Sequence, residues 1–178
     1  MKQFVHLLLP IALFSIAAAL PLTSYDINSD SAKVIFEIGN LGLTVEGSVD
    51  KPSGKVVFDP ADLANSSVNA SVKVSAVKTG IDQRDEHLQK EEYFHASKYP
   101  TMSFRSTSIS KTDKGYTAKG SLTIKGTTKT VNIPFTVSNN VFKGSFKIDR
   151  LDYGVGESSW VTSDDVKIIF ELPVSTSK

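Results

Sequence analysis

The chain has 178 residues, of which 40% are hydrophobic and 22% charged, a balance typical of one folded domain that excludes disorder for most of its length. The 20 Lys and Arg residues oppose 19 Asp and Glu residues, so no general basic field exists to attract nucleic acid. Cysteine is absent, which excludes disulfide bonds, thiol catalysis and cysteine metal sites.

The N-terminal segment has the pattern of an export signal. Residues 4–20 contain no Asp, Glu, Lys or Arg, follow Lys2 and end in a run of alanines. This order predicts a signal peptide at residues 1–19 and a single domain at 20–178. An uncleaved anchor is the alternative, but the run is short for a membrane span, contains Pro10 and lacks a basic residue on its far side. We therefore do not expect an integral membrane protein after signal removal.

From Tyr25 onward, hydrophobic and polar residues alternate, which predicts strands with one buried face. The clearest strand is residues 68–76, and the others are residues 34–38, 43–49, 122–124, 131–137, 142–148 and 166–172. Short turns are expected at Gly39-Asn40, Pro52-Ser53-Gly54, Asp113-Lys114-Gly115, Gly126-Thr127 and Asn139-Asn140. This punctuation favours an all-β fold, an eight-stranded antiparallel barrel that closes on itself, with a frayed tail after Pro173.

One segment breaks the strand pattern. Residues 82–90 are rich in helix formers and lack alternation, so we expect one or two helical turns in an insertion around residues 82–95. The connection from Gly80 to Pro100 is the one long excursion between strands. Long ordered loops often carry binding functions.

Motifs along the whole chain support a more specific assignment. They are Gly80, Arg84-Asp85, His87-Leu88, Tyr93-Phe94, Lys98-Tyr99-Pro100, Gly120–Gly126, Thr128-Lys129 and Arg150–Gly156. Their order resembles the YceI-like domain family over residues 25–172. The resemblance implies a lipocalin-like barrel, export to a bacterial periplasm, a polyisoprenoid or other long-chain amphiphile in the barrel, and often a homodimer. One departure is His95, which stands where the family pattern has an acidic residue.

Apolar side chains at alternating strand positions are candidates for lining the barrel interior and contacting an isoprenoid or acyl-chain lipid. They are Phe36, Val45, Phe58, Val72, Val74, Phe104, Leu122, Ile124, Phe135, Phe146, Ile148, Ile168 and Phe170. Simple core packing is the alternative for each of them, because apolar periodicity reports only burial. An eight-stranded barrel is just wide enough to be filled by side chains or to hold one thin ligand.

The polar candidates are few. Arg84 is a candidate for contacting a lipid headgroup at the barrel mouth, and the alternative is that Arg84 and Asp85 pin the long loop. Trp160 is expected to plug one end of the barrel, and the alternative is that it projects into a partner. His87, Glu91, Glu92 and His95 lack a known metal-ligand spacing and indicate a solvated helix face. No nucleophile elbow or phosphate-binding loop is present, so we predict no catalytic residue, metal or cofactor.

Three functions remain open at this point. The leading hypothesis is a periplasmic or secreted lipid-binding protein, a carrier or store without enzymatic activity. The second is a non-catalytic interaction or stress-related module whose barrel is filled by its own side chains. The third is a lipid-modifying enzyme, which would need a titrating group inside the barrel, and the strand faces offer none.

Overall fold

The computed structural model describes residues 23–177 of the chain, and the predicted signal peptide lies outside them. The strands are β1 (Ser24–Ile27), β2 (Lys33–Asn40), β3 (Leu43–Val49), β4 (Ser53–Val57), β5 (Ser67–Lys73), β6 (Val77–Lys78), β7 (Thr101–Thr112), β8 (Gly115–Ile124), β9 (Thr127–Ser138), β10 (Val141–Asp149) and β11 (Thr162–Thr176). One α-helix in this range, α1 (Asp82–Leu88), confirms the short helical insertion. Three 3₁₀ turns add to it, namely η1 (Leu63–Asn65), η2 (Val74–Ala76) and η3 (Leu151–Tyr153).

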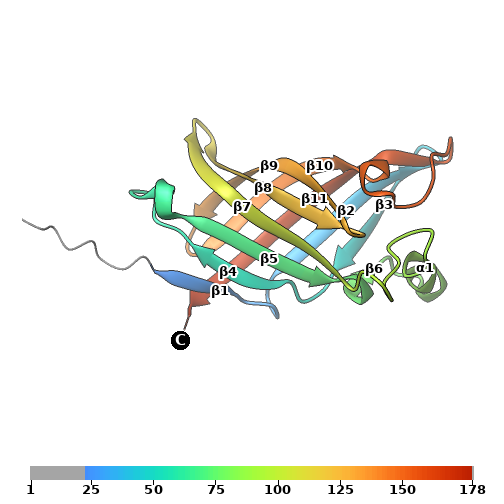
Figure 1. Ribbon diagram of the computed structural model, residues 1–178, viewed down its shortest axis with the longest axis horizontal. Helices are drawn as coiled ribbons and strands as arrows, with labels where there is room; N and C mark the ends of the chain where they lie inside the picture. Colours follow the sequence, from blue (N-terminus) through green and yellow to red (C-terminus); the bar gives the residue numbers. More distant parts are fainter. Residues whose placement is uncertain (1–22, 178) are drawn as a thin grey trace, which may run out of the picture.

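Eight antiparallel strands close into the predicted barrel. Their order is β1-β4-β5-β7-β8-β9-β10-β11, and β11 pairs with β1 to complete the ring. The remaining strands, β2, β3 and β6, lengthen the wall at the end of the barrel next to α1 (Figure 1). This extension is possible because β11 is long enough to pair with β1 near its C-terminus and with β2 over the rest of the same edge.

The strands near the N-terminus bend where a simple meander was expected. Pro52-Ser53-Gly54 forms a bend, not a hairpin, because β3 pairs with β2 while β4 pairs with β1. Gly54 is required there, since a Cβ atom would lie 2.1 Å from the carbonyl oxygen of Asn69. The strand predicted at residues 68–76 ends at Lys73, where η2 changes the direction of the chain. Before η2, β5 pairs with β4, and after it, β6 pairs with β3.

Turn positions differ slightly from expectation. The β2–β3 turn is at Leu41-Gly42, two residues past the predicted Gly39-Asn40, and the β8–β9 turn is at Lys125-Gly126, one residue before the predicted Gly126-Thr127. Both residues of each turn have positive φ, as tight hairpins require. The C-terminal tail is not frayed, because β11 continues to Thr176 and pairs with β1.

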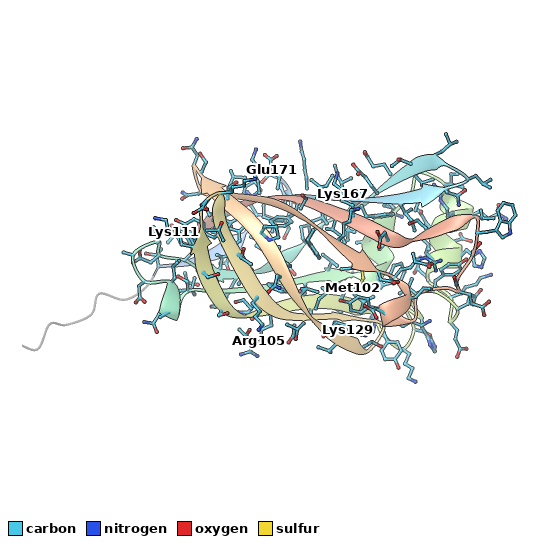
Figure 2. The ribbon with its side chains drawn as sticks, turned by 90° about the horizontal axis from the view of Figure 1, so that it is seen from above. Met102, Arg105, Lys111, Lys129, Lys167 and Glu171 are labelled. Carbon is cyan, nitrogen blue, oxygen red and sulfur yellow. The ribbon has the colours of Figure 1, made fainter. Side chains whose placement is uncertain are left out.

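The two faces of the wall differ in chemistry. On the outer face, Lys143 pairs with Glu171 and Lys167 with Glu37, each at 3.0 Å. Figure 2 shows Lys167 and Glu171 at the periphery of the molecule. The alternate residues of the same strands, such as Phe146 and Phe170, pack against the buried core. Within residues 23–177 no helix has the length and apolarity that crossing a membrane requires.

Candidate functional site

Apolar side chains from four neighbouring strands form rows across the inner face of the barrel. One row runs Val45, Ile38, Val166, Ile148 across β3, β2, β11 and β10. The next runs Gly47, Phe36, Ile168, Phe146, and a third runs Val34, Phe170, Gly144. Residues directly opposite each other on antiparallel strands share a face, so these rows make one continuous apolar wall.

We call the members of these rows that carry side chains the inner wall: Val34, Phe36, Ile38, Val45, Phe146, Ile148, Val166, Ile168 and Phe170. All of them are partly exposed although they face the barrel interior. Two glycines make room for aromatic rings. A Cβ atom on Gly47 would lie 2.2 Å from the ring of Phe36, and one on Gly144 would lie 2.6 Å from the ring of Phe170. An apolar surface that faces inward and is still open to solvent is suited to an apolar guest.

Six predicted candidates belong to the inner wall: Phe36, Val45, Phe146, Ile148, Ile168 and Phe170. The candidate set omitted Val34, Ile38 and Val166. The signal that identifies them is the same period-two alternation, because they flank Phe36 on β2 and Ile168 on β11.

Other candidates lie in the packed part of the barrel. Val74, Phe104, Leu122, Ile124 and Phe135 are all buried, and each except Val74 belongs to the core cluster. Val74 lies in η2 and is 1% exposed. For these positions the contacts present are those of core packing.

The barrel end formed by the β7–β8 and β9–β10 hairpins is closed by an aromatic cluster. Phe58 lies 5.0 Å from Tyr116, 5.9 Å from Phe135 and 5.5 Å from Phe142, measured between ring centroids. Tyr116 stacks on Phe135. Phe58 and Phe135 therefore fill this end with edge and stacked ring contacts. The last candidate, Val72, lies on β5 opposite Met102 and is partly exposed.

The opposite end carries a cap made of loops. The amide of Gly156 donates to the carbonyl oxygen of Glu92, and Lys125 Nζ donates to the carbonyl oxygens of Gly154 at 2.6 Å and Glu92 at 3.3 Å. Tyr93 and the buried Tyr153 and Val155 of these loops pack on the core. Burial raises the pKa of the Tyr153 phenol. The long insertion is therefore tied to the η3 loop and the β8–β9 turn.

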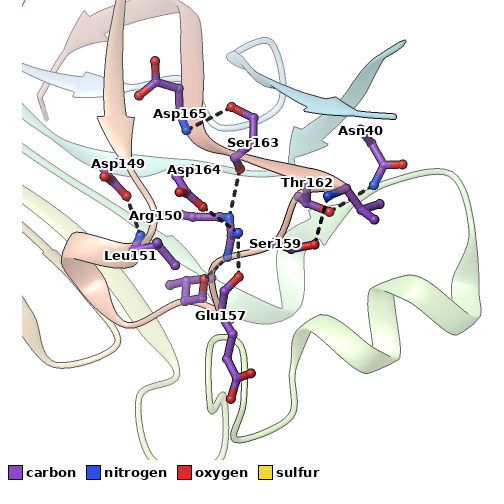
Figure 3. A network of polar contacts seen from close by, with 12 residues as sticks. Asn40, Asp149, Arg150, Leu151, Glu157, Ser159, Thr162, Ser163, Asp164 and Asp165 are labelled. Carbon is purple, nitrogen blue, oxygen red and sulfur yellow. Dashed lines mark hydrogen bonds and ion pairs between the residues drawn. The ribbon is translucent and has the colours of Figure 1, made fainter. Parts of the chain in front are cut away.

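Arg150 holds the loop between β10 and β11 in place. It is 7% exposed, and its guanidinium donates to the carbonyl oxygens of Ser163, Val155 and Glu157 and to the carboxylate of Asp164 at 2.9 Å (Figure 3). The Arg150 guanidinium therefore stabilises the conformation of this loop.

Trp160, in the same loop, does not plug the barrel as predicted: it is 90% exposed. Arg150 ties the neighbouring backbone to β11, and the core next to the loop is already filled by Tyr153 and Val155.

Arg84 is not part of the inner wall. Its Nη2 donates to the carbonyl oxygen of Thr79 at 2.8 Å, and it lines a depression of about 440 Å³ with Ile81, Gln83, Glu86, His87 and Lys90. Asp85, which is buried, accepts from the amide of Thr79 at 2.8 Å and from its hydroxyl. The Thr79 hydroxyl, with further help from the Thr79 amide and the nearby Lys78 and Arg84, lowers the pKa of Asp85 against the opposing effect of burial. Arg84 and Asp85 therefore both brace the start of the insertion through Thr79.

A second concave region lies outside the barrel. A groove of about 620 Å³, lined mostly by residues of the outer face, contains apolar and charged side chains, namely Ile35, Tyr116, Pro134, Phe135, Ile169 and Phe170 with Lys33, Lys114, Lys143, Lys167 and Glu171. Its charged rim makes it a poorer site for a wholly apolar chain than the inner wall.

His87 contacts Glu92 at 3.0 Å on the surface, and no group of three His, Asp or Glu side chains in the described part of the chain is arranged to hold a metal.

The sequence model of the YceI-like domain matches residues 25–174 of this chain. The chain belongs to the YceI-like domain family. A UPF0312 protein of Vibrio cholerae is 31% identical over 169 residues, covering 84% of this chain and 88% of its own. The crystal structure of BcnA from Burkholderia cenocepacia, also 31% identical, superposes with a TM-score of 0.79 over 84% of this chain and 99% of that one.

A more distant structural neighbour extends the comparison of folds. A polyisoprenoid-binding domain from Saccharophagus degradans covers 88% of this chain and all of its own, with a TM-score of 0.67 and 14% identity. At that identity the likeness shows the shared fold alone. The expected lipocalin-like barrel is thus confirmed for this YceI-like protein.

Proposed function

We propose that this protein binds one long-chain amphiphile, an isoprenoid or acyl-chain lipid, against the inner wall of its barrel. The observation that carries the proposal is the partial exposure of this wall, whose side chains face inward yet remain open to solvent. The resemblance to the YceI-like domain family, which implies a polyisoprenoid or other long-chain amphiphile, supports the same class of ligand. The role is that of a binding protein rather than an enzyme, because the inner wall contains only apolar side chains.

The inner wall supplies enough free energy for this role. Burial of a methylene group contributes about 0.8 kcal/mol, so a chain of about ten carbons contributes about 8 kcal/mol before the ordering costs are subtracted. Hydrogen bonds are not needed for this gain, and selectivity follows chain length and width. The aromatic cluster around Phe58 closes the far end, so we expect the chain to enter at the end near α1, beside the loops tied by Lys125, and to stop at these rings.

Arg84 remains our candidate for contacting the polar end of the ligand. It lies on α1, at the same end of the barrel as the extended wall (Figure 1). Its Nε has no hydrogen-bond partner among the described residues but is buried, so contact with a headgroup through this atom requires the side chain to move. Arg84→Ala should weaken retention of a lipid with an anionic head and leave an uncharged prenol unaffected, while Arg84→Lys should restore part of the difference.

Native mass spectrometry of the exported protein, purified without detergent, tests the proposal. We expect one co-purifying prenyl or acyl lipid per chain, identified after organic extraction. Bare protein that also takes up neither added farnesol nor palmitic acid from solution would overturn it. That result would favour the filled-barrel interaction module, in which the core packing of Phe104 and Leu122 continues across the inner wall.

Location and assembly are parts of the same proposal. A signal peptide at residues 1–19 would direct the protein to the periplasm, where a long-chain lipid needs shielding from water. Periplasmic fractionation with sequencing of the mature N-terminus tests this location. The homodimer implied by the family resemblance stays a prediction, which the mass of the native protein tests.

A further inference from the structure

Exposed apolar side chains gather at one place on this molecule. The large hydrophobic residues exposed in the described structure are Leu41, Leu43, Ile81 and Trp160, with exposed fractions of 64%, 73%, 52% and 90%. Three of them, Leu41, Leu43 and Trp160, come from the β2–β3 hairpin and from the adjoining loop before β11. We call these three residues the tip.

Hydrogen bonds hold the two turns of the tip together. The amide of Leu41 donates to the carbonyl oxygen of Val161 at 2.8 Å, and Asn40 Nδ2 donates to Thr162 Oγ1 at 3.1 Å (Figure 3). The amide of Val161 donates in turn to Ser159 Oγ at 3.0 Å. The tip is therefore a fixed feature of the fold, not a set of unrelated surface residues.

The backbone of the tip is unusual for its side chains. Leu41 has φ of 49° at the first position of a two-residue hairpin turn, followed by Gly42 at 79°. That position favours Asn, Asp or Gly, because a larger side chain is strained at positive φ. The Leu41 side chain is 64% exposed, so this conformational cost is not offset by packing against the barrel.

The chemistry of the tip fits a lipid surface. Residues 39–44 and 158–163 contain no charged side chain, only Leu, Val and Trp among Gly, Asn, Ser and Thr. Tryptophan with neighbouring leucines is the composition that settles at the boundary between lipid headgroups and acyl chains. The side chains stand on two projecting turns instead of lining a groove, so they suit a deformable surface into which they can insert.

The tip also continues into the candidate lipid site. Leu43 pairs with Asn40 at the end of β2 and β3, and the next inward positions on these strands are Val45 and Ile38 of the inner wall. A ligand leaving a bilayer at the tip would therefore meet apolar surface along the strands toward the barrel interior.

We propose that the tip docks on the surface of a lipid bilayer and that the amphiphile passes there between the membrane and the inner wall. This inference rests on the proposed function, since it supplies the source of the bound lipid. Docking is driven by apolar insertion, because the tip has no charge to attract anionic headgroups.

Trp160 is the only tryptophan in the chain, so its fluorescence reports on the tip directly. With vesicles of zwitterionic phosphatidylcholine, we expect the Trp160 emission of the exported protein to shift to shorter wavelength and to be quenched by lipids brominated near the headgroup. The vesicle affinity should be equal at low and high salt. Leu41→Ser with Leu43→Ser should weaken it by about tenfold or more, because each leucine inserted contributes apolar burial. Ile81→Ser, which changes an exposed apolar residue outside the tip, is the matched control and should have no effect.

Several results would overturn this proposal. Emission that does not respond to vesicles, a response unchanged in the double leucine variant, or binding only to anionic vesicles at low salt would each do so. A shift that follows protein concentration without vesicles would assign the tip to contact between two copies of the chain. Uptake of farnesol from solution, measured without vesicles, keeps the two proposals separate: if uptake persists while docking fails, the barrel still binds lipid and only the tip assignment is wrong.

Discussion

Blocking the inner wall from one side gives the most direct test of where the ligand lies. Val45 and Thr44 are adjacent residues of similar size on β3, and Val45 belongs to the inner wall while Thr44 is exposed on the other face. Val45→Trp places an indole over the row formed with Ile38, Val166 and Ile148. Thr44→Trp adds the same ring to the outside and serves as the control.

The expected loss follows from the volume taken by the ring. An indole at Val45 displaces about three methylene groups of the ligand, each contributing about 0.8 kcal/mol, for a total of about 2.4 kcal/mol. Since 1.4 kcal/mol corresponds to a tenfold change, the dissociation constant should rise about 50-fold. Thr44→Trp should leave it unchanged.

The assay is displacement of an environment-sensitive fluorescent fatty acid by palmitic acid and by farnesol, with thermal unfolding of each variant measured in parallel. Equal affinity in Val45→Trp and wild type, with both proteins folded, would refute the location of the site. Equal losses in Val45→Trp and Thr44→Trp would show that the ring disturbs β3 and not the ligand.

Three further predictions concern stability. Because folding lowers the pKa of Asp85, this carboxylate stabilises the fold fully above its ordinary pKa of 3.8, and the stabilisation is lost as the pH falls below that value. Asp85→Asn should therefore reduce the acid dependence of urea unfolding in that range, and an unchanged pH profile would contradict this. Phe58→Ala removes a ring from the aromatic cluster and should lower the free energy of unfolding by about 3 kcal/mol in urea titrations, whereas a loss near zero would mean that the cluster is not packed. Arg150→Ala should lower the free energy of unfolding by about 2–4 kcal/mol, because several charge-assisted hydrogen bonds disappear. Arg150→Lys should not restore this stability, since an ammonium group cannot make the same set of hydrogen bonds as a guanidinium, and full recovery would contradict the assigned role.

The sequence was most informative where the physical cause is local. Alternation on the strands identified Phe36, Phe146, Ile168 and Phe170 as one face, and the structure places them on one wall. The turn at Asn139-Asn140 and the helix in the insertion were also predicted, because positive φ at asparagine and runs of helix formers are local preferences.

Sequence reasoning failed where the position of a residue depends on segments that are distant in the chain. Trp160 was expected to be covered, but the core next to its loop is filled by Tyr153 and Val155, so the indole remains outside. The tail after Pro173 was expected to fray, yet β1 lies beside it and supplies hydrogen bonds. The segment at residues 68–76 could not continue as one strand, because its two parts pair with different strands.

The sequence by itself determined that this protein is built of strands with one apolar face, that it lacks thiol chemistry, and that its motifs resemble those of YceI-like domains. Only the tertiary structure decided which apolar faces are filled and which stay open. Alternation reports that a side chain turns away from water, not which atoms cover it. Phe104 lies between Ala70 and Leu122 of its neighbouring strands and is buried in the core. Phe36 lies opposite Gly47, which has no side chain to pack on its ring, and stays partly exposed.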